Sequence, residues 1–179
     1  IMTEFINNIA GDKTLPQSHA GGGGMFIQQC IIVLIKETKF MSNLALQRHT
    51  GGIQLEETCK CFVVDSNFTA NKGKHAGAIC GLFGTIFRFY LVTFIKNSAF
   101  LYSGAIHVQH ISISFIYKST FRENKGRAIS ATSGLLLSAF RVTFVRNKEG
   151  IRVNKFFKVS VQNSTFFENK GSFGGAIHI

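Results

Sequence analysis

The stretch that decides the fold is FFENKGSFGGAI, residues 166–177, in which Phe-x-x-Asn is followed by a glycine-rich step that ends in Ile. A Phe-x-x-Asn followed by a small-residue step that ends in Ile occurs six times along the chain. The Phe residues are Phe40, Phe68, Phe94, Phe121, Phe144 and Phe166, the Asn residues are Asn43, Asn71, Asn97, Asn124, Asn147 and Asn169, and the Ile residues are Ile53, Ile79, Ile106, Ile129, Ile151 and Ile177. A motif repeated at this period indicates a repeat architecture.

The spacing of the motifs separates a constant segment from a variable one. From Ile to the next Phe is fifteen residues in every interval, whereas from Phe to the following Ile is 13, 11, 12, 8, 7 and 11 residues. Stacked strands must keep their register, while a loop at a corner can change length. Repeats of 22 to 28 residues cannot bury a core alone, so their short strands must stack on those of neighbouring repeats. The pattern therefore predicts an all-β fold. We expect a right-handed parallel β-helix of about six to seven coils, since parallel crossovers are right-handed.

We expect one β-helix domain over residues 1–179. In this prediction residues 1–37 form an irregular first coil, because Ile27 precedes Phe40 by thirteen residues instead of fifteen, and residues 38–179 form the regular coils. No translocator barrel is predicted, because the chain does not show its alternating membrane strands. The chain ends within a repeat, so we expect a fragment whose partners include flanking repeats of a longer parent chain.

Stacking predicts that equivalent residues of neighbouring coils contact one another. The six Phe should form an internal aromatic ladder, and the six Asn a ladder of side-chain amides at a corner whose left-handed backbone Asn tolerates. The glycines before Ile would supply positive φ or close approach between coils. A bend is expected two residues before Phe, where Ser66, Ser119 and Ser164 recur. The residue after Ile should point outward, which places His107 and His178 in solvent.

Composition limits the range of partners. The net charge of +11 favours anionic surfaces such as sulfated glycans, acidic lipid headgroups or nucleic acid. No recognised nucleic-acid motif accompanies the charge, and no apolar run is long enough to span a bilayer, so neither nucleic-acid binding nor membrane insertion is predicted. The four cysteines show no zinc spacing, which leaves buried free thiols or one disulfide between adjacent coils.

The pattern of titratable residues does not predict catalysis. Enzymes with a β-helix fold need clustered carboxylates, but Glu123 and Glu168 lie two coils apart with Arg146 between them. Together with Lys96 these residues alternate in sign and predict a surface charge ladder. His49 and His75 occupy adjacent coils without a third metal ligand. We therefore predict no catalytic, cofactor-binding or metal-binding residue.

A lysine follows the repeated Asn in four of the coils. These residues are Lys72, Lys125, Lys148 and Lys170. The last three belong to consecutive coils, so they should form a positive stripe along one corner. The stripe is a candidate anion-binding ridge, and the alternative is that it serves solubility and protects strand edges.

Phe-x-x-Asn paired with Gly-Gly-Ala-Ile resembles the polymorphic outer membrane protein (Pmp) repeat, which is best known from chlamydial surface proteins. The closest match is Phe166 to Ile177, whereas Phe121 to Ile129 has lost both glycines. The resemblance covers residues from about 38 to 179. It implies the passenger of an autotransporter, associated with adhesion to host cells.

The hypothesis is therefore a non-enzymatic repeat domain of a secreted or cell-surface protein, outer-membrane-associated if the source is bacterial. It would bind an anionic glycan or a host cell-surface receptor through its variable loops. The alternative is a carbohydrate-active β-helix enzyme, a polysaccharide lyase or glycosidase.

Overall fold

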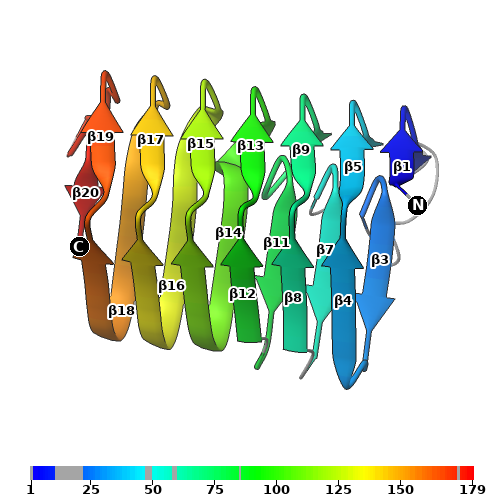
Figure 1. Ribbon diagram of the computed structural model, residues 1–179, viewed down its shortest axis with the longest axis horizontal. Helices are drawn as coiled ribbons and strands as arrows, with labels where there is room; N and C mark the ends of the chain where they lie inside the picture. The colour runs from blue at the N-terminus through cyan, green and yellow to red at the C-terminus, as the bar shows by residue number, and fades with distance from the viewer. Residues whose placement is uncertain (1, 11–21, 47–49, 58–59, 85, 173) are drawn as a thin grey trace.

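The computed structural model describes residues 2–10, 22–46, 50–57, 60–84, 86–172 and 174–179. They form a parallel β-helix of stacked coils, drawn in Figure 1 with its long axis horizontal. Every pairing between the named strands is parallel, as in the pairing of β9 with β13 and of β13 with β15. Seven strands of one sheet come from successive coils, so the chain makes about six turns. The prediction of an all-β solenoid is confirmed.

The strands fall into three groups. The seven-stranded sheet contains β1 (Thr3–Ile6), β5 (Thr38–Met41), β9 (Asn67–Thr69), β13 (Thr93–Ile95), β15 (Thr120–Arg122), β17 (Thr143–Val145) and β19 (Thr165–Phe167). Short strands that follow the Asn column, or precede the Phe column, are β2 (Ile9–Ala10), β3 (Met25–Gln28), β4 (Ile32–Lys36), β6 (Leu44–Ala45), β7 (Ile53–Glu56), β8 (Lys60–Val64), β10 (Lys72–Gly73), β11 (Ile79–Leu82), β12 (Ile86–Tyr90) and β20 (Ile177–His178). In the later coils these merge into β14 (Ser98–Tyr117), β16 (Lys125–Phe140) and β18 (Glu149–Gln162).

Three corners of each coil are made by residues with a left-handed backbone. Their φ angles lie between 46° and 59° among the described non-glycine residues. The bend before Phe falls three residues ahead of it, at Asp65 and Leu91, and not at the Ser66 position as the sequence suggested. The corner before Asn is made by the residue that precedes it, for example Lys96, so the prediction that Asn itself takes the left-handed conformation is wrong. The Asn side chain serves the stack instead.

The structure places the Phe column inside the coil as one continuous stack. Phe40, Phe68, Phe94, Phe121 and Phe144 are fully buried. Ring centroids lie 5.1 Å apart between Phe68 and Phe94 and 4.7 Å apart between Phe94 and Phe121, with interplanar angles of 14° and 10°. Phe5 extends the stack at one end and Phe166 at the other. The spacing follows the distance between hydrogen-bonded strands, so the ladder also reports the register of the coils.

The Asn column forms a hydrogen-bonded ladder along one corner. Asn97 shows the pattern: its Nδ2 donates to Phe68 O at 2.8 Å and to Asn124 Oδ1 at 3.2 Å, and its backbone N–H donates to the same Oδ1 at 3.0 Å. Its own Oδ1 accepts two bonds from Asn71. The pattern repeats from Asn8 to Asn169. Buried polar groups need such partners, and a primary amide supplies both donors and an acceptor.

The glycines before Ile are required by close approach between coils. A Cβ added at Gly77 would overlap the carbonyl oxygen of Gly104 in the next coil, and one added at Gly52 would overlap the carbonyl of Ala78. Positive φ at glycine occurs among the described residues at Gly84 and Gly126, which lie outside this step. Of the two roles expected for these glycines, close approach is the one that the structure shows.

The residue that follows the repeated Ile is buried in several coils, contrary to the expectation that it points to solvent. His107 is only 3% exposed, and its ring stacks on Tyr102 at 4.6 Å between centroids. Gln54 and Cys80 at the equivalent positions are also buried. The reason is that the variable segment after Asn folds back over this face of the strand and brings Tyr102 onto it. His178, in the last coil, is half-buried.

Burial also governs the cysteines. No disulfide joins Cys30, Cys61 and Cys80 among the described residues, and Cys59 lies outside them. Burial raises the pKa of the Cys80 thiol to about 12; the neighbouring Thr50 side chain opposes this shift, and the charge of Glu56 supports it. The neutral thiol is therefore the stable form in the folded chain.

We expect Cys80 to resist alkylation by iodoacetamide at pH 8 in the folded protein, because only the thiolate reacts. Mass spectrometry of peptides before and after denaturation would measure this, with half-buried Cys30 as the internal comparison. Since the unfolded thiol ionises near its ordinary value of 9, its contribution to stability should be present below pH 9 and lost between about pH 9 and 12. Rapid alkylation of Cys80 without unfolding would contradict its burial.

Candidate functional site: a lysine-lined groove

A groove of about 1140 Å³ lies over the coils in which the variable segment is shortest. Only eight residues separate Phe121 from Ile129, and seven separate Phe144 from Ile151. The preceding coil carries a longer segment that contains residues 99–102, and the following coil contributes Lys170 and Ser172. The groove is thus produced by a difference in loop length between neighbouring coils, on a backbone that is otherwise regular.

Three of the four predicted ridge lysines line this groove. Lys125, Lys148 and Lys170 follow members of the Asn ladder, and their backbone N–H groups donate to Asn97, Asn124 and Asn147 of the preceding coils. Their side chains are exposed, and within the described residues no ion pair joins them to a carboxylate. Because strands repeat about every 4.8 Å, the amines form a row along the helix axis.

Lys72 does not belong to the groove. It pairs in register with Ser98, which in turn pairs with Lys125, so a serine interrupts the ridge. The predicted ridge therefore divides into two parts: Lys72 lies apart from the groove, and the other three lysines line it. The interruption was visible in the sequence as Ser98 after Asn97.

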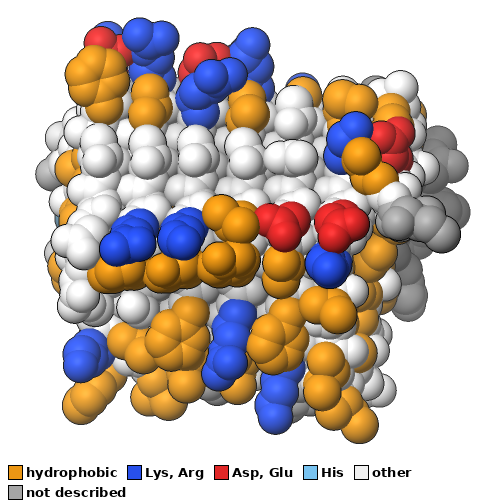
Figure 2. Space-filling view, viewed as in Figure 1, with side chains coloured by type: hydrophobic (Ala, Val, Ile, Leu, Met, Phe, Trp, Pro, Cys, Tyr) orange, Lys and Arg blue, Asp and Glu red, His pale blue; other side chains and the backbone are white. Residues whose placement is uncertain are grey.

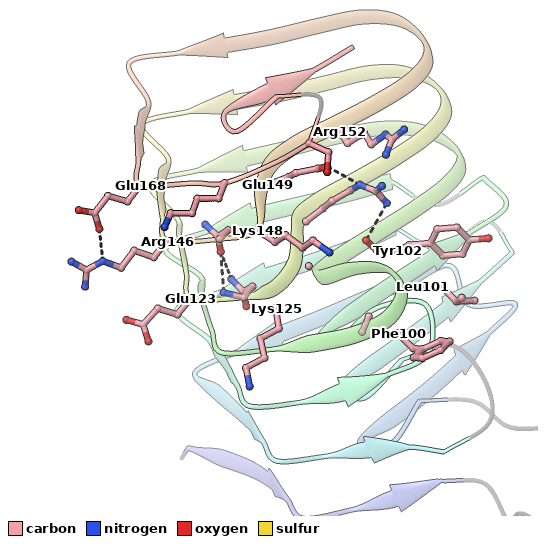
Figure 3. A pocket seen from close by; sticks show the side chains of 17 residues that line it. Phe100, Leu101, Tyr102, Glu123, Lys125, Arg146, Lys148, Glu149, Arg152 and Glu168 are labelled. Atoms are coloured by element: carbon pink, nitrogen blue, oxygen red, sulfur yellow. Dashed lines mark hydrogen bonds and ion pairs between the residues drawn. The ribbon is translucent and has the colours of Figure 1, made fainter.

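Charged pairs border the lysine row. On one side of the row the corner residues Glu123, Arg146 and Glu168 lie along the coils, as Figure 3 shows. Arg146 Nε lies 2.6 Å from Glu168 Oε2, and this hydrogen bond and charge raise the pKa of the Arg146 guanidinium. Lys96 Nζ lies 3.8 Å from Glu123 Oε2. Two of the contacts that the alternating charges predicted are therefore present, Lys96 with Glu123 and Arg146 with Glu168.

A buried ion pair forms the floor, and sequence reasoning missed it. Arg127 Nε lies 2.8 Å from Glu149 Oε2, and Glu149 is only 6% exposed. Arg127 also donates from Nη1 to the carbonyl oxygen of Tyr102 at 3.3 Å, which ties the long segment to the floor. The two residues pair in register, at a column occupied by Thr50, Ala76 and Ser103 in other coils. Opposite charges at one column of adjacent coils were the available signal.

An aromatic and aliphatic wall closes the other side. Phe100 is 85% exposed, and Leu101 and Tyr102 are 43% and 44% exposed. Figure 3 shows these side chains opposite the row of Glu123, Arg146 and Glu168, with Lys125 and Lys148 between. Of the side chains that line the groove, six are cationic and three are acidic. The site can therefore hold an anionic ligand that also offers an apolar face to the rings.

The described residues contain no cluster of three or more His, Cys, Asp or Glu side chains that could hold a metal ion. His49, one of the two histidines considered for a metal, lies outside them. His75 contacts the rings of Tyr102 and His107, at centroid distances of 5.2 and 6.3 Å. In the same part of the chain, no helix is long and apolar enough to cross a bilayer.

Comparison with known proteins gives one match. The family model described as a right-handed beta helix region matches residues 23–179. No curated protein and no solved structure shows significant similarity to the chain.

Proposed function

The chain belongs to the family of right-handed beta helix regions, and from this premise we propose that it is a non-enzymatic binding domain of a secreted or cell-surface protein. Its ligand is an anionic glycan, held in the groove over the short coils. The observation that carries the proposal is the row of Lys125, Lys148 and Lys170, exposed and without carboxylate partners among the described residues.

The chemistry of the groove favours a sulfated or carboxylated sugar over a simple anion. A row of amines repeated at the coil spacing matches a polymer that carries charge at intervals, and lysine binds such groups as a point charge. The exposed ring of Phe100 offers an apolar surface next to the amines, which suits the apolar face of a sugar ring. The resemblance to the Pmp repeat adds the expectation of adhesion to a cell surface, in the passenger part of an exported protein.

The matched pair Lys148→Glu and Lys72→Glu tests the proposal. Both lysines are exposed and both follow an Asn of the ladder, but only Lys148 lines the groove. With a heparin-derived octasaccharide as probe, we expect Lys148→Glu to weaken binding roughly tenfold, about 1.4 kcal/mol, and Lys72→Glu to change it little. Isothermal titration calorimetry would measure both. Equal losses in the two variants would show that net charge, not the groove, determines binding.

The rival function is a carbohydrate-active enzyme, and one observation favours it: Glu123, Glu149 and Glu168 line the same groove. Each carboxylate contacts an arginine or lysine, as an electrostatic border would require. Incubation of the protein with heparin and other acidic polysaccharides, followed by measurement of new reducing ends, separates the two. Turnover that disappears in Glu149→Gln would replace the binding proposal with the enzymatic one.

A further inference from the structure

A row of mostly charged residues runs along the front of the molecule, at the corner that precedes the corner of Glu123, Arg146 and Glu168 in each coil. The described residues at this corner are Glu37, Asp65, Leu91, Lys118, Arg141 and the uncharged Asn163, and we call the first five the corner row. Each member has a left-handed backbone with φ between 46° and 55°. Figure 2 shows a row at mid-height in which acidic side chains are followed by apolar and then by basic ones. None of the five lines the lysine groove.

The register of the coils makes this row straight. The backbone N–H of each member donates to the next coil, from Asp65 to Tyr90 O and from Lys118 to Phe140 O, for example. The residues just before them pair strand to strand without a shift. Because the corners share one conformation and one register, their side chains leave the surface in the same direction at about 4.8 Å intervals.

The sign of the charges in the row changes at Leu91: the two residues before it are acidic and the two after it are basic. A twofold axis through Leu91 and parallel to the strands would place Glu37 opposite Arg141 of a second copy, and Asp65 opposite Lys118. The same row on an antiparallel copy is therefore its own complement, which is the property of an isologous interface. Glu37 contacts Lys36 in its own chain at 3.2 Å, an exposed pair of the kind that contributes little.

The surface beside the row is apolar and aromatic. Tyr90, Tyr117 and Phe140 stack with centroids 5.4 Å apart, and Lys118 and Arg141 lie over these rings. Figure 2 shows hydrophobic side chains over most of the sheet below the row. Exposed apolar surface of this extent marks an interaction site.

The same axis pairs this apolar surface with itself. It places Val64 opposite Tyr117 of the copy and Phe62 opposite Phe115. Arg88, which lies 5.6 Å from both the Phe62 and the Phe115 ring centroids, meets its own copy at the axis. This is a like-charge contact that the surrounding apolar pairs must offset.

The geometry of the rings argues against a sugar on this surface. Tyr117 is stacked between Tyr90 and Phe140 at interplanar angles of 7° and 6°, so ring faces are turned toward each other and edges toward solvent. A strand surface covered by ring edges in this way suits packing against a second surface of the same kind. The strands below the corner row, with five residues in each of five coils as in β12, give roughly 400 Å² at standard strand spacings. This is about half of the 800 Å² or so that each partner contributes to a standard interface, so the paired charges of the corner row must supply part of the stability.

We propose that the chain forms an antiparallel homodimer through this face, with the corner rows of the two copies paired about Leu91. The proposal is independent of the ligand in the groove. It uses only residues that the groove does not.

Charge reversal tests the proposal in both directions. The double variant Lys118→Glu with Arg141→Glu makes the row wholly acidic apart from Leu91, and Glu37→Lys with Asp65→Lys makes it wholly basic. We expect the parent chain to dimerise in sedimentation velocity over a concentration series and each double variant to be monomeric under the same conditions. Mixing the two variants in equal amounts should restore a dimer, detected as a heterodimer by native mass spectrometry.

The control is Lys96→Glu with Lys155→Glu, which changes net charge equally at exposed positions outside the row. It should dimerise like the parent. A monomeric parent chain would overturn the proposal, as would double variants that still dimerise or a mixture that stays monomeric while circular dichroism shows both variants folded.

Discussion

Replacing Phe94 by Ala is expected to lower the free energy of unfolding by roughly 3–5 kcal/mol, because it opens a cavity in the middle of the aromatic ladder. Phe94 is fully buried and stacks on Phe68 below and Phe121 above. The neighbouring coils are held apart by hydrogen-bonded strands, so they cannot collapse into the space. Chemical denaturation followed by circular dichroism would measure the loss.

Phe100→Ala is the matched control for this substitution. It removes the same side chain from a position that is 85% exposed, so we expect a change in stability within about 0.5 kcal/mol. Equal stability losses at the two positions would contradict the assignment of the ladder to the core.

Asn97→Ala is expected to destabilise the fold by roughly 3 kcal/mol or more, since several buried hydrogen-bonding groups would lose partners at once. Asn71 would lose the acceptor of two bonds, and Phe68 O and Asn124 Oδ1 would each lose a donor. The effect should exceed that of removing an ordinary surface hydrogen bond because the whole set is buried.

Asn97→Asp tests the hydrogen bonds that the Asn97 side chain donates separately from those that it accepts. It keeps an oxygen that Asn71 can bond but replaces the Nδ2 donors by a carboxylate oxygen. We expect a stability loss comparable to that of the Ala variant at neutral pH, measured in the same denaturation assay. Wild-type stability in Asn97→Asp would show that the donor bonds to Phe68 and Asn124 contribute little.

The stacking of the coils could be predicted from the sequence because packing imposes it on each repeat independently. The constant fifteen residues from Ile to Phe reflect strands that must pair with the coils on both sides, so length changes are confined to the segment between Asn and Ile. The residues of the Phe and Asn columns could be named for the same reason. The alternating charges at Lys96, Glu123, Arg146 and Glu168 also follow from register alone.

The parts that could not be predicted depend on how the variable segments fold. The burial of His107 arises because Tyr102, five residues earlier, turns back over the strand, and a strict in-out alternation cannot describe this. The groove likewise results from two short coils beside a longer one, and its buried pair of Arg127 and Glu149 requires knowing which loop covers them. The bends lie one residue before the serine column, and the sequence does not show this because Asp65, Leu91 and Lys118, which take the left-handed conformation, share no residue type.

The most direct test of the stacked-coil account is a methyl NOESY spectrum of protein labelled at the Ile δ1 methyl groups. Ile79, Ile106 and Ile129 are register partners in consecutive strands. The account predicts cross-peaks between Ile79 and Ile106 and between Ile106 and Ile129, and none between Ile79 and Ile129, which lie two coils or about 10 Å apart. Absence of both neighbouring cross-peaks, or a direct contact between Ile79 and Ile129, would contradict it.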